Sequence, residues 1–250
     1  MPTGIRAVAA LGRIVAAMRQ VEQNWRGLRP NERVERIARA VMGELTTIGV
    51  TNPNLQVARF PGLSGQFDFG PWTLQVDEGM AMGKINQPHV PTVAALGDTI
   101  THEARHCEQW FRMARYLAAE RRAKGMLVTG LELGNRLGIR NAQATQAAAA
   151  APALTQEESR EAQEWYESVY GSQSSFRSQT YGTSLRSTGT GTGGNWQMSQ
   201  YTRYQRALAE EEDAWSTGTE LQRLFLQHYP GTTPPTLMRH QPVRQGVSQY

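Results

Sequence analysis

The stretch "GDTITHEARHCEQWFRMARYLAAE" (residues 97–120) constrains the fold more than any other part of this chain. From about Val93 to about Lys124, apolar and polar residues recur with the period of an α-helix. Gly125 follows at the position where such a helix commonly ends. The pattern predicts one long helix, and the residues expected along one of its sides are Ala95, Thr99, His102, His106, Gln109 and Met113.

Inside this helix, "HEARH" places two histidines four positions apart, His102 and His106, with Glu103 directly after the first. Side chains at i and i+4 lie one above the other on a helix, so both imidazoles can point at one ion. Imidazole nitrogens bind zinc at about 2.0–2.1 Å. Glu103 lies beside that face, where it can take a proton from a metal-activated water. The chain has only 5 His, so a chance match to this H-E-x-x-H pattern is unexpected, and we predict a zinc site.

A catalytic zinc ion usually has three protein ligands and one position for water, so one ligand is missing from this helix. The metzincin extension H-E-x-x-H-x-x-G-x-x-H fails, because Gln109 replaces its glycine and Arg112 replaces its last histidine. The third ligand is therefore expected to be an acidic residue from elsewhere. The acids that the helical patterns place away from the histidines, or that lack a supporting motif, are Glu108, Glu120, Glu132, Glu161 and Glu164.

The segment "LAEEEDAW" (208–215) resembles the helix that carries the third ligand in many gluzincins, which has the pattern E-x-x-A or E-x-D-A. The resemblance implies that Glu211 is the third ligand, with Glu210 as the alternative. It also implies that Ala214 lets this helix pack closely under the metal helix. Asp213 is then expected to orient a ligand histidine through its other ring nitrogen. The competing interpretation is an acidic patch at a helix N-terminus, which the helix dipole favours.

Two segments together, "THEARHCEQW" and "YQRALAEEEDAW", resemble a wider family. They are similar to the zincin metallopeptidase-like domains of bacterial polymorphic toxins and of cargo associated with contractile injection systems. In those domains a "HE-x-x-H…Q" helix precedes a "Y-x-x-L-P-E-E-x-D-A" segment, and here Ala209 stands where the proline often is. The similarity covers residues 30–220. The site residues that it implies are the zinc ligands His102, His106 and Glu211 and the general base Glu103.

The chain is expected to divide into five parts. In order, these are an N-terminal helix (1–28), a zincin-like core (29–170), a flexible Ser/Thr/Gly-rich insertion (171–197), a helical segment that completes the metal site (198–229) and a disordered tail (230–250). In the core, Pro30 opens a helix with a buried apolar stripe, and Thr155 with Glu158 forms a capping box that opens another. The alternating stretches "LQVARF" and "QFDFGPWTLQVDE" predict two or three antiparallel strands.

An enzyme of this type also needs a group that stabilises the oxyanion formed on the attacked carbonyl. The candidates are Tyr201, Tyr204, Tyr166 and Arg105, and the residues alone do not choose among them. Arg105 is expected rather to pair with Glu108 or another neighbouring acid. In zincins an edge strand above the metal commonly pairs with extended substrate; here Gly70-Pro71 interrupts that strand, so a short or bent groove is expected.

The remaining candidates have ordinary structural interpretations. Cys107 is expected to be a small buried residue, and His89 is expected in a loop without a partner. The arginines of the second helix are expected on its solvated face: Arg33, Arg36 and Arg39. The tryptophans and the phenylalanine expected in the core are Trp110, Phe111, Trp165 and Trp215.

Composition excludes several other classes. The net charge is only +4, without a dense basic stripe and interleaved aromatics, so nucleic-acid binding is not expected. No apolar run reaches the roughly 18 residues that a membrane span needs. The single cysteine excludes an internal disulfide and fits synthesis in a reducing compartment. The family resemblance implies synthesis in the bacterial cytoplasm, with secretion or injection that uses no signal peptide.

These observations predict an α+β, zincin-like fold, mostly helical, with a small antiparallel sheet packed on the H-E-x-x-H helix. The function expected from it is a zinc-dependent peptidase, in which water activated by zinc and Glu103 attacks a peptide bond. Its partners would be a protein or peptide substrate and, by resemblance, a secretion or injection apparatus. The alternative is a non-catalytic module of such an apparatus, in which zinc only holds helices together.

Overall fold

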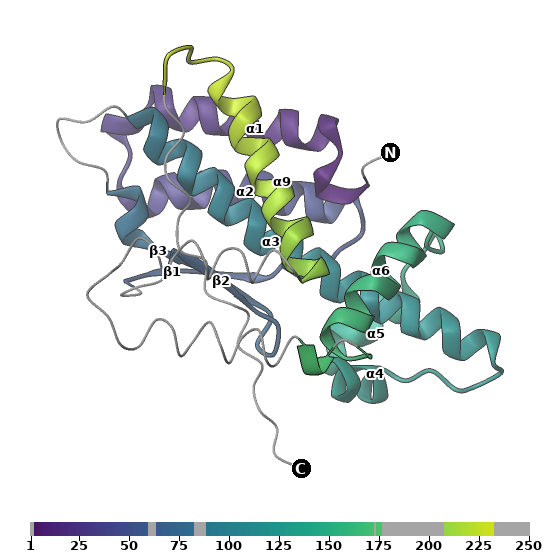
Figure 1. Ribbon diagram of the computed structural model, residues 1–250. Coiled ribbons are helices and arrows are strands. Elements are labelled where there is room, and N and C mark those ends of the chain that lie inside the picture. Colours follow the sequence, from purple (N-terminus) through teal and green to yellow (C-terminus); the bar gives the residue numbers. More distant parts are fainter. Residues whose placement is uncertain (1–2, 60–63, 83–88, 173, 177–207, 233–250) are drawn as a thin grey trace.

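The fold is built around one long helix, α3 (His89–Ala123), which nearly every other element contacts (Figure 1). The computed structural model describes residues 3–59, 64–82, 89–172, 174–176 and 208–232. Within these ranges α3 ends where the sequence predicts. Gly125 follows it in the left-handed region at φ 68°, and the N–H groups of Gly125 and Met126 donate to the last carbonyls of the helix.

Three helices pack along α3 to form the larger part of the core: α1 (Val8–Gln23), α2 (Pro30–Thr47) and α9 (Ala209–Leu226). Helix α2 begins at Pro30, whose missing N–H and fixed φ suit the first turn. Its predicted apolar stripe is buried at Val34, Ile37, Ala38, Val41 and Leu45, while the remaining member, Met42, is half-buried. Short 3-10 turns flank α1 at Gly4–Arg6 and Trp25–Gly27.

The sheet corrects one prediction, because it is mixed rather than antiparallel. Its strands are β1 (Asn54–Ala58), β2 (Gly65–Asp68) and β3 (Thr73–Asp77), in the spatial order β1-β3-β2. Strand β3 pairs antiparallel with β2 and parallel with β1. Three successive strands alternate in direction, so the pairing depends on which strand is central. That choice is tertiary, and the alternating pattern of each strand does not contain it.

Strands β2 and β3 contact α3, as expected of a sheet packed on that helix. The sheet contributes three fully buried side chains to the core: Phe67, Leu74 and Val76. A 3-10 turn at Glu78–Ala81 follows β3. Strand β2 lies at the edge of the sheet. One of the two edge strands, β2, therefore lies next to the H-E-x-x-H helix.

A second group of helices gathers around the C-terminal part of α3 (Figure 1): α4 (Gly130–Leu137), α5 (Asn141–Ala149) and α6 (Gln156–Val169). The predicted capping box is present, since the Thr155 hydroxyl accepts from the Glu158 N–H and the Glu158 carboxylate accepts from the Thr155 N–H. Gly138 follows α4 in the left-handed region, at φ 66°.

Two single-residue predictions are wrong. His89 is the first residue of α3 rather than part of a loop, and it stacks on Trp25 with ring centroids 5.1 Å apart. Arg33 is buried rather than solvated, because its guanidinium donates to the carbonyls of Trp25 and Ala81 and lies over the Trp25 ring.

Most of the predicted insertion (171–197), the first part of the predicted helical segment (198–207) and the tail from residue 233 lie outside the described residues. In the described part of the chain, no helix combines the length and apolar character needed to cross a membrane. The fold shown is thus mostly helical α+β with a small mixed sheet.

Candidate metal centre

Helix α3 presents the two histidines to each other, as the i, i+4 spacing predicts. The Nε2 atoms of His102 and His106 lie 3.2 Å apart, and their ring centroids lie 4.8 Å apart. Both side chains are 1% exposed. Trp215 and Trp110 pack edge-on against the two rings, with centroids 5.2 Å from His102 and 6.1 Å from His106. These tryptophans belong to the core, as expected, and they give the histidines an apolar surround.

Helix α9 brings Glu211 to the same point. Its Oε2 atom lies 3.7 Å from Nε2 of His102 and 3.5 Å from Nε2 of His106. Small residues allow α9 to lie close to α3: Ala214 is fully buried, and a Cβ added to Gly218 would lie 2.0 Å from the Asp98 carboxylate. Positions 211, 214 and 218 follow the i, i+3, i+7 spacing of one helix face, so the packing that brings α9 close also places Glu211.

The three donor atoms have the spacing that a zinc ion requires. The centre of a triangle with sides of 3.2, 3.5 and 3.7 Å lies about 2.0 Å from each corner, which is close to usual zinc–nitrogen and zinc–oxygen distances. Two neutral imidazoles and one carboxylate are also a common zinc donor set. Among the described residues, the group that could hold a metal contains Glu211 and not Glu210.

The carboxylates around the His106 ring favour its protonated form. Burial lowers the pKa of His106, but the Glu211 carboxylate, with smaller contributions from Glu103 and Gln109, more than offsets this and raises the pKa to about 9. A metal ion must displace that proton, because it binds the neutral imidazole. The carboxylate that stabilises the imidazolium therefore also favours a cation that replaces its proton.

Glu103, the predicted general base, is held by strand β2. Its Oε2 atom accepts a hydrogen bond of 2.8 Å from the backbone N–H of Phe67, and the side chain is 1% exposed. Gly65 makes this approach possible, since a Cβ there would lie 2.6 Å from Thr99 Cγ2 and 3.3 Å from Glu103 Cγ. The N–H of Phe67 is engaged by Glu103, so at this residue it is not free to pair with an extended substrate.

Gln109, rather than Asp213, contacts the second ring nitrogen of a predicted ligand. Its Oε1 atom lies 2.8 Å from Nδ1 of His106, and its Nε2 donates to Asp213 Oδ2 at 2.8 Å. Asp213 thus reaches His106 only through Gln109. The helical pattern predicts Gln109 on the histidine side of α3 without indicating a role for it, and its i+3 position after His106 is the sequence signal for this contact.

Arg105 is an internal partner of buried acids, as expected. It is fully buried and donates to Glu108 at 2.6 Å and to Asp213 at 2.7 Å. Burial raises the pKa of Asp213, but the Arg105 guanidinium outweighs it and the pKa is lowered. An arginine held by two carboxylates in this way is a poor candidate for oxyanion stabilisation.

The tyrosine candidates divide in two. Tyr166 lies on α6, where its hydroxyl accepts a hydrogen bond of 2.7 Å from Arg136 of α4, so it belongs to the second helical group. Tyr201 and Tyr204 lie outside the described residues. Cys107 is buried and is part of the core, as predicted.

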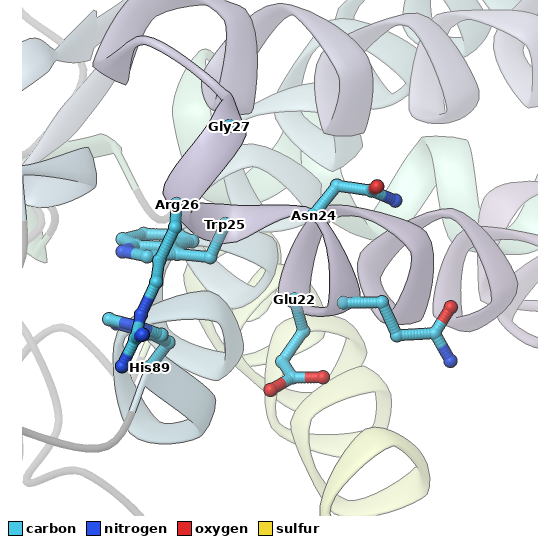
Figure 2. Close-up of a pocket in the computed structure, with 7 residues that line it drawn as sticks. Glu22, Asn24, Trp25, Arg26, Gly27 and His89 are labelled. Carbon is cyan, nitrogen blue, oxygen red and sulfur yellow. The ribbon is translucent and has the colours of Figure 1, made fainter.

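A pocket of about 430 Å³ lies elsewhere, beside the N-terminal end of α3 (Figure 2). Its lining includes Trp25, Arg26 and His89 together with Glu22. His89 precedes His102 by thirteen helical positions, which corresponds to about 20 Å along the axis. Burial and the nearby guanidinium of Arg26 lower the pKa of His89. This pocket is separate from the histidine–glutamate centre.

Comparisons with protein-family models, curated proteins and solved structures gave no match to this chain. The resemblance to zincin-like toxin and injection-cargo domains therefore rests on its motifs and on the local geometry above. The structure shows a buried His-His-Glu group on two helices that is compatible with an H-E-x-x-H metal site.

Proposed function

We propose that this protein is a zinc-dependent peptidase of the gluzincin type. The observation that carries the proposal is the convergence of His102 and His106 of α3 with Glu211 of α9 at zinc-ligand spacing. Glu103 lies next to the first ligand in the chain, and its carboxylate acts on the His106 ring electrostatically. Those are the parts that metal-assisted hydrolysis needs: three ligands and a neighbouring base.

Each residue has a definite task in this proposal. A bound zinc ion would lower the pKa of a water molecule and polarise the substrate carbonyl. Glu103 accepts the proton of the attacking water and passes it to the leaving amine. The Phe67 N–H keeps the Glu103 carboxylate aimed, and Trp215 and Trp110 give the centre the apolar surround in which its charges act strongly. The resemblance adds the role of a bacterial effector, with a protein substrate reached through an injection apparatus.

The burial of the centre favours one second candidate, a non-catalytic module. His102, His106, Glu103 and Glu211 are each 1% exposed. A closed site holding zinc would join α3 to α9 without turnover, as structural zinc sites do. The two functions differ in whether a fourth coordination position accepts an outside molecule.

The mechanism is tested by Glu103→Gln, which keeps the shape of the side chain and removes its basicity. Wild type is incubated with a mixture of synthetic peptides of varied sequence, and products are identified by mass spectrometry. We expect zinc-dependent cleavage that is lost in Glu103→Gln while zinc remains bound. Cleavage retained in Glu103→Gln would contradict the proposed base.

Cobalt substitution separates the enzyme from the module. Co²⁺ has visible absorption bands that respond to its coordination, and a small hydroxamate binds metals in open zincin-type sites. An open fourth position predicts a spectral change when acetohydroxamate is added. An unchanged spectrum, together with no cleavage by wild type, would favour the structural module.

A further inference from the structure

The amide of Gln109 has only one orientation that satisfies its neighbours. One end of the amide lies 2.8 Å from the carbonyl oxygen of Glu210 and 2.8 Å from Oδ2 of Asp213. A carbonyl oxygen and a carboxylate oxygen only accept hydrogen bonds, so this end must be the NH₂ group. The carbonyl end, Oε1, therefore faces Nδ1 of His106 at 2.8 Å.

This orientation determines which nitrogen of His106 carries a proton. Oε1 of an amide can only accept, so Nδ1 of His106 must donate. In the neutral ring the lone pair is then on Nε2, the atom that faces His102 and Glu211. We propose that Gln109 is a positioning residue that fixes this tautomer of His106 and so presents Nε2 to a metal ion. The inference rests on the proposed metal site.

Asp213 holds Gln109 in turn and cannot easily move. Its two oxygens accept from Arg105 at 2.7 and 3.2 Å and from Arg6 at 2.9 Å, and Arg105 also donates to Glu108. Arg105 and Glu108 are fully buried, and the network reaches the surface only through Arg6 and a small part of the Asp213 side chain. A buried charged network of this kind stays in one geometry because leaving any member unpaired is costly.

Both anchors of Gln109 lie within the first five residues of α9, one before and one after Glu211. The same few residues of α9 therefore supply the third proposed ligand, Glu211, and orient Gln109, which fixes the tautomer of the second ligand, His106. This arrangement ties the tautomer of His106 to the docking of α9 on α3.

The direct test is a long-range ¹H–¹⁵N correlation spectrum of the zinc-loaded wild type, which distinguishes a protonated from a metal-bound ring nitrogen. We expect His106 to carry its proton on Nδ1 and to bind zinc through Nε2. Zinc bound through Nδ1, with the proton on Nε2, would overturn the inference whatever any variant does.

The variant test is Gln109→Met, which preserves length and removes the acceptor. Loss of a group that orients a metal ligand typically weakens metal binding by about 10–100-fold. We expect a loss of zinc affinity in this range, and in the zinc-free chain a neutral His106 ring that shifts toward the tautomer with the proton on Nε2. Gln222→Met is the matched control: Gln222 is also a buried glutamine, and it lies on α9. The zinc affinity of Gln222→Met should stay within about twofold of that of wild type. Equal zinc affinities for Gln109→Met and wild type would refute the positioning role of Gln109.

The outcome is separable from that of the proposed function. If wild type binds zinc but cleaves no peptide, the proposed peptidase function is rejected. The role of Gln109 is then still tested by the zinc affinity of Gln109→Met and by the tautomer of His106. If wild type binds no zinc, the metal site fails. The spectrum of the zinc-free chain, at a pH where the ring is neutral, then decides: Nδ1–H supports the role of Gln109, and Nε2–H removes it.

Discussion

At the scale of single residues, the candidate site depends on atoms with almost no freedom to move. Glu103 is fixed by one backbone N–H from β2, and His106 is fixed by one amide oxygen. The groups that make these contacts, the Phe67 N–H and the Gln109 amide, have roles that become clear only in the folded structure. Gly65 also matters for Glu103, because β2 can approach α3 this closely only where a side chain is missing.

Gly65→Ala should therefore lower both stability and turnover while leaving zinc bound. The added Cβ would overlap Thr99 Cγ2 and press on the Gln75 carbonyl, so β2 must shift away from α3. Overpacking of this kind costs about 1–3 kcal/mol. Urea unfolding measures the loss. Gly43→Ala is the control: a Cβ there meets nothing within 4 Å on α2, so the helix should gain stability of about 0.5–1 kcal/mol. Unchanged stability in Gly65→Ala would contradict the close approach.

At the scale of elements, the contact between α3 and α9 forms the site, and a buried ion pair fixes its register. Asp213 of α9 faces Arg105 of α3, while Gly218 and Asp98 meet farther along the two helices. Asp213 lies two positions after Glu211 in α9. Loss of the Asp213–Arg105 ion pair should weaken the packing of α9 on α3 near Glu211, the proposed third ligand.

The ion pair predicts a specific dependence of stability on pH. The pKa of Asp213 is lowered in the folded chain from its ordinary value of 3.8, so the folded state binds fewer protons there than the unfolded state. Its contribution is complete above about pH 4 and is lost as pH falls through the folded pKa. We expect Asp213→Asn to cost about 3 kcal/mol or more at pH 7. The difference from wild type should shrink below pH 4. A difference independent of pH, or one matched by the exposed control Glu212→Gln, would count against the pair.

At the scale of the whole molecule, the single cysteine reports on global stability. Cys107 is fully buried in the core, and burial raises the pKa of its thiol well above the ordinary range. Alkylation therefore requires unfolding. A ligand that binds only the folded state, at a hundred times its dissociation constant, stabilises it by about 2.7 kcal/mol. Zinc at that level should slow iodoacetamide labelling by roughly a hundredfold, and a chelator should reverse the effect. Fast labelling of the native chain, or no effect of zinc, would contradict this prediction.

Prediction from the sequence succeeded where the information was local. The stripe of α2, the capping box at Thr155 and the i, i+4 histidines each depend on neighbours within one helix. Glu211 came from a motif resemblance rather than from local physics. The mixed pairing of β3 and the role of Gln109 were missed because both depend on segments that only the tertiary fold brings together.

The central claim is that His102, His106 and Glu211 hold one zinc ion. It is tested most directly by metal analysis of the purified chain after incubation with zinc and removal of the unbound metal. We predict one zinc per chain for wild type, none retained by Glu211→Ala, and full retention by Glu212→Ala, whose side chain is exposed on the same turn of α9. Wild type without zinc, or Glu211→Ala with as much zinc as wild type, would contradict the account.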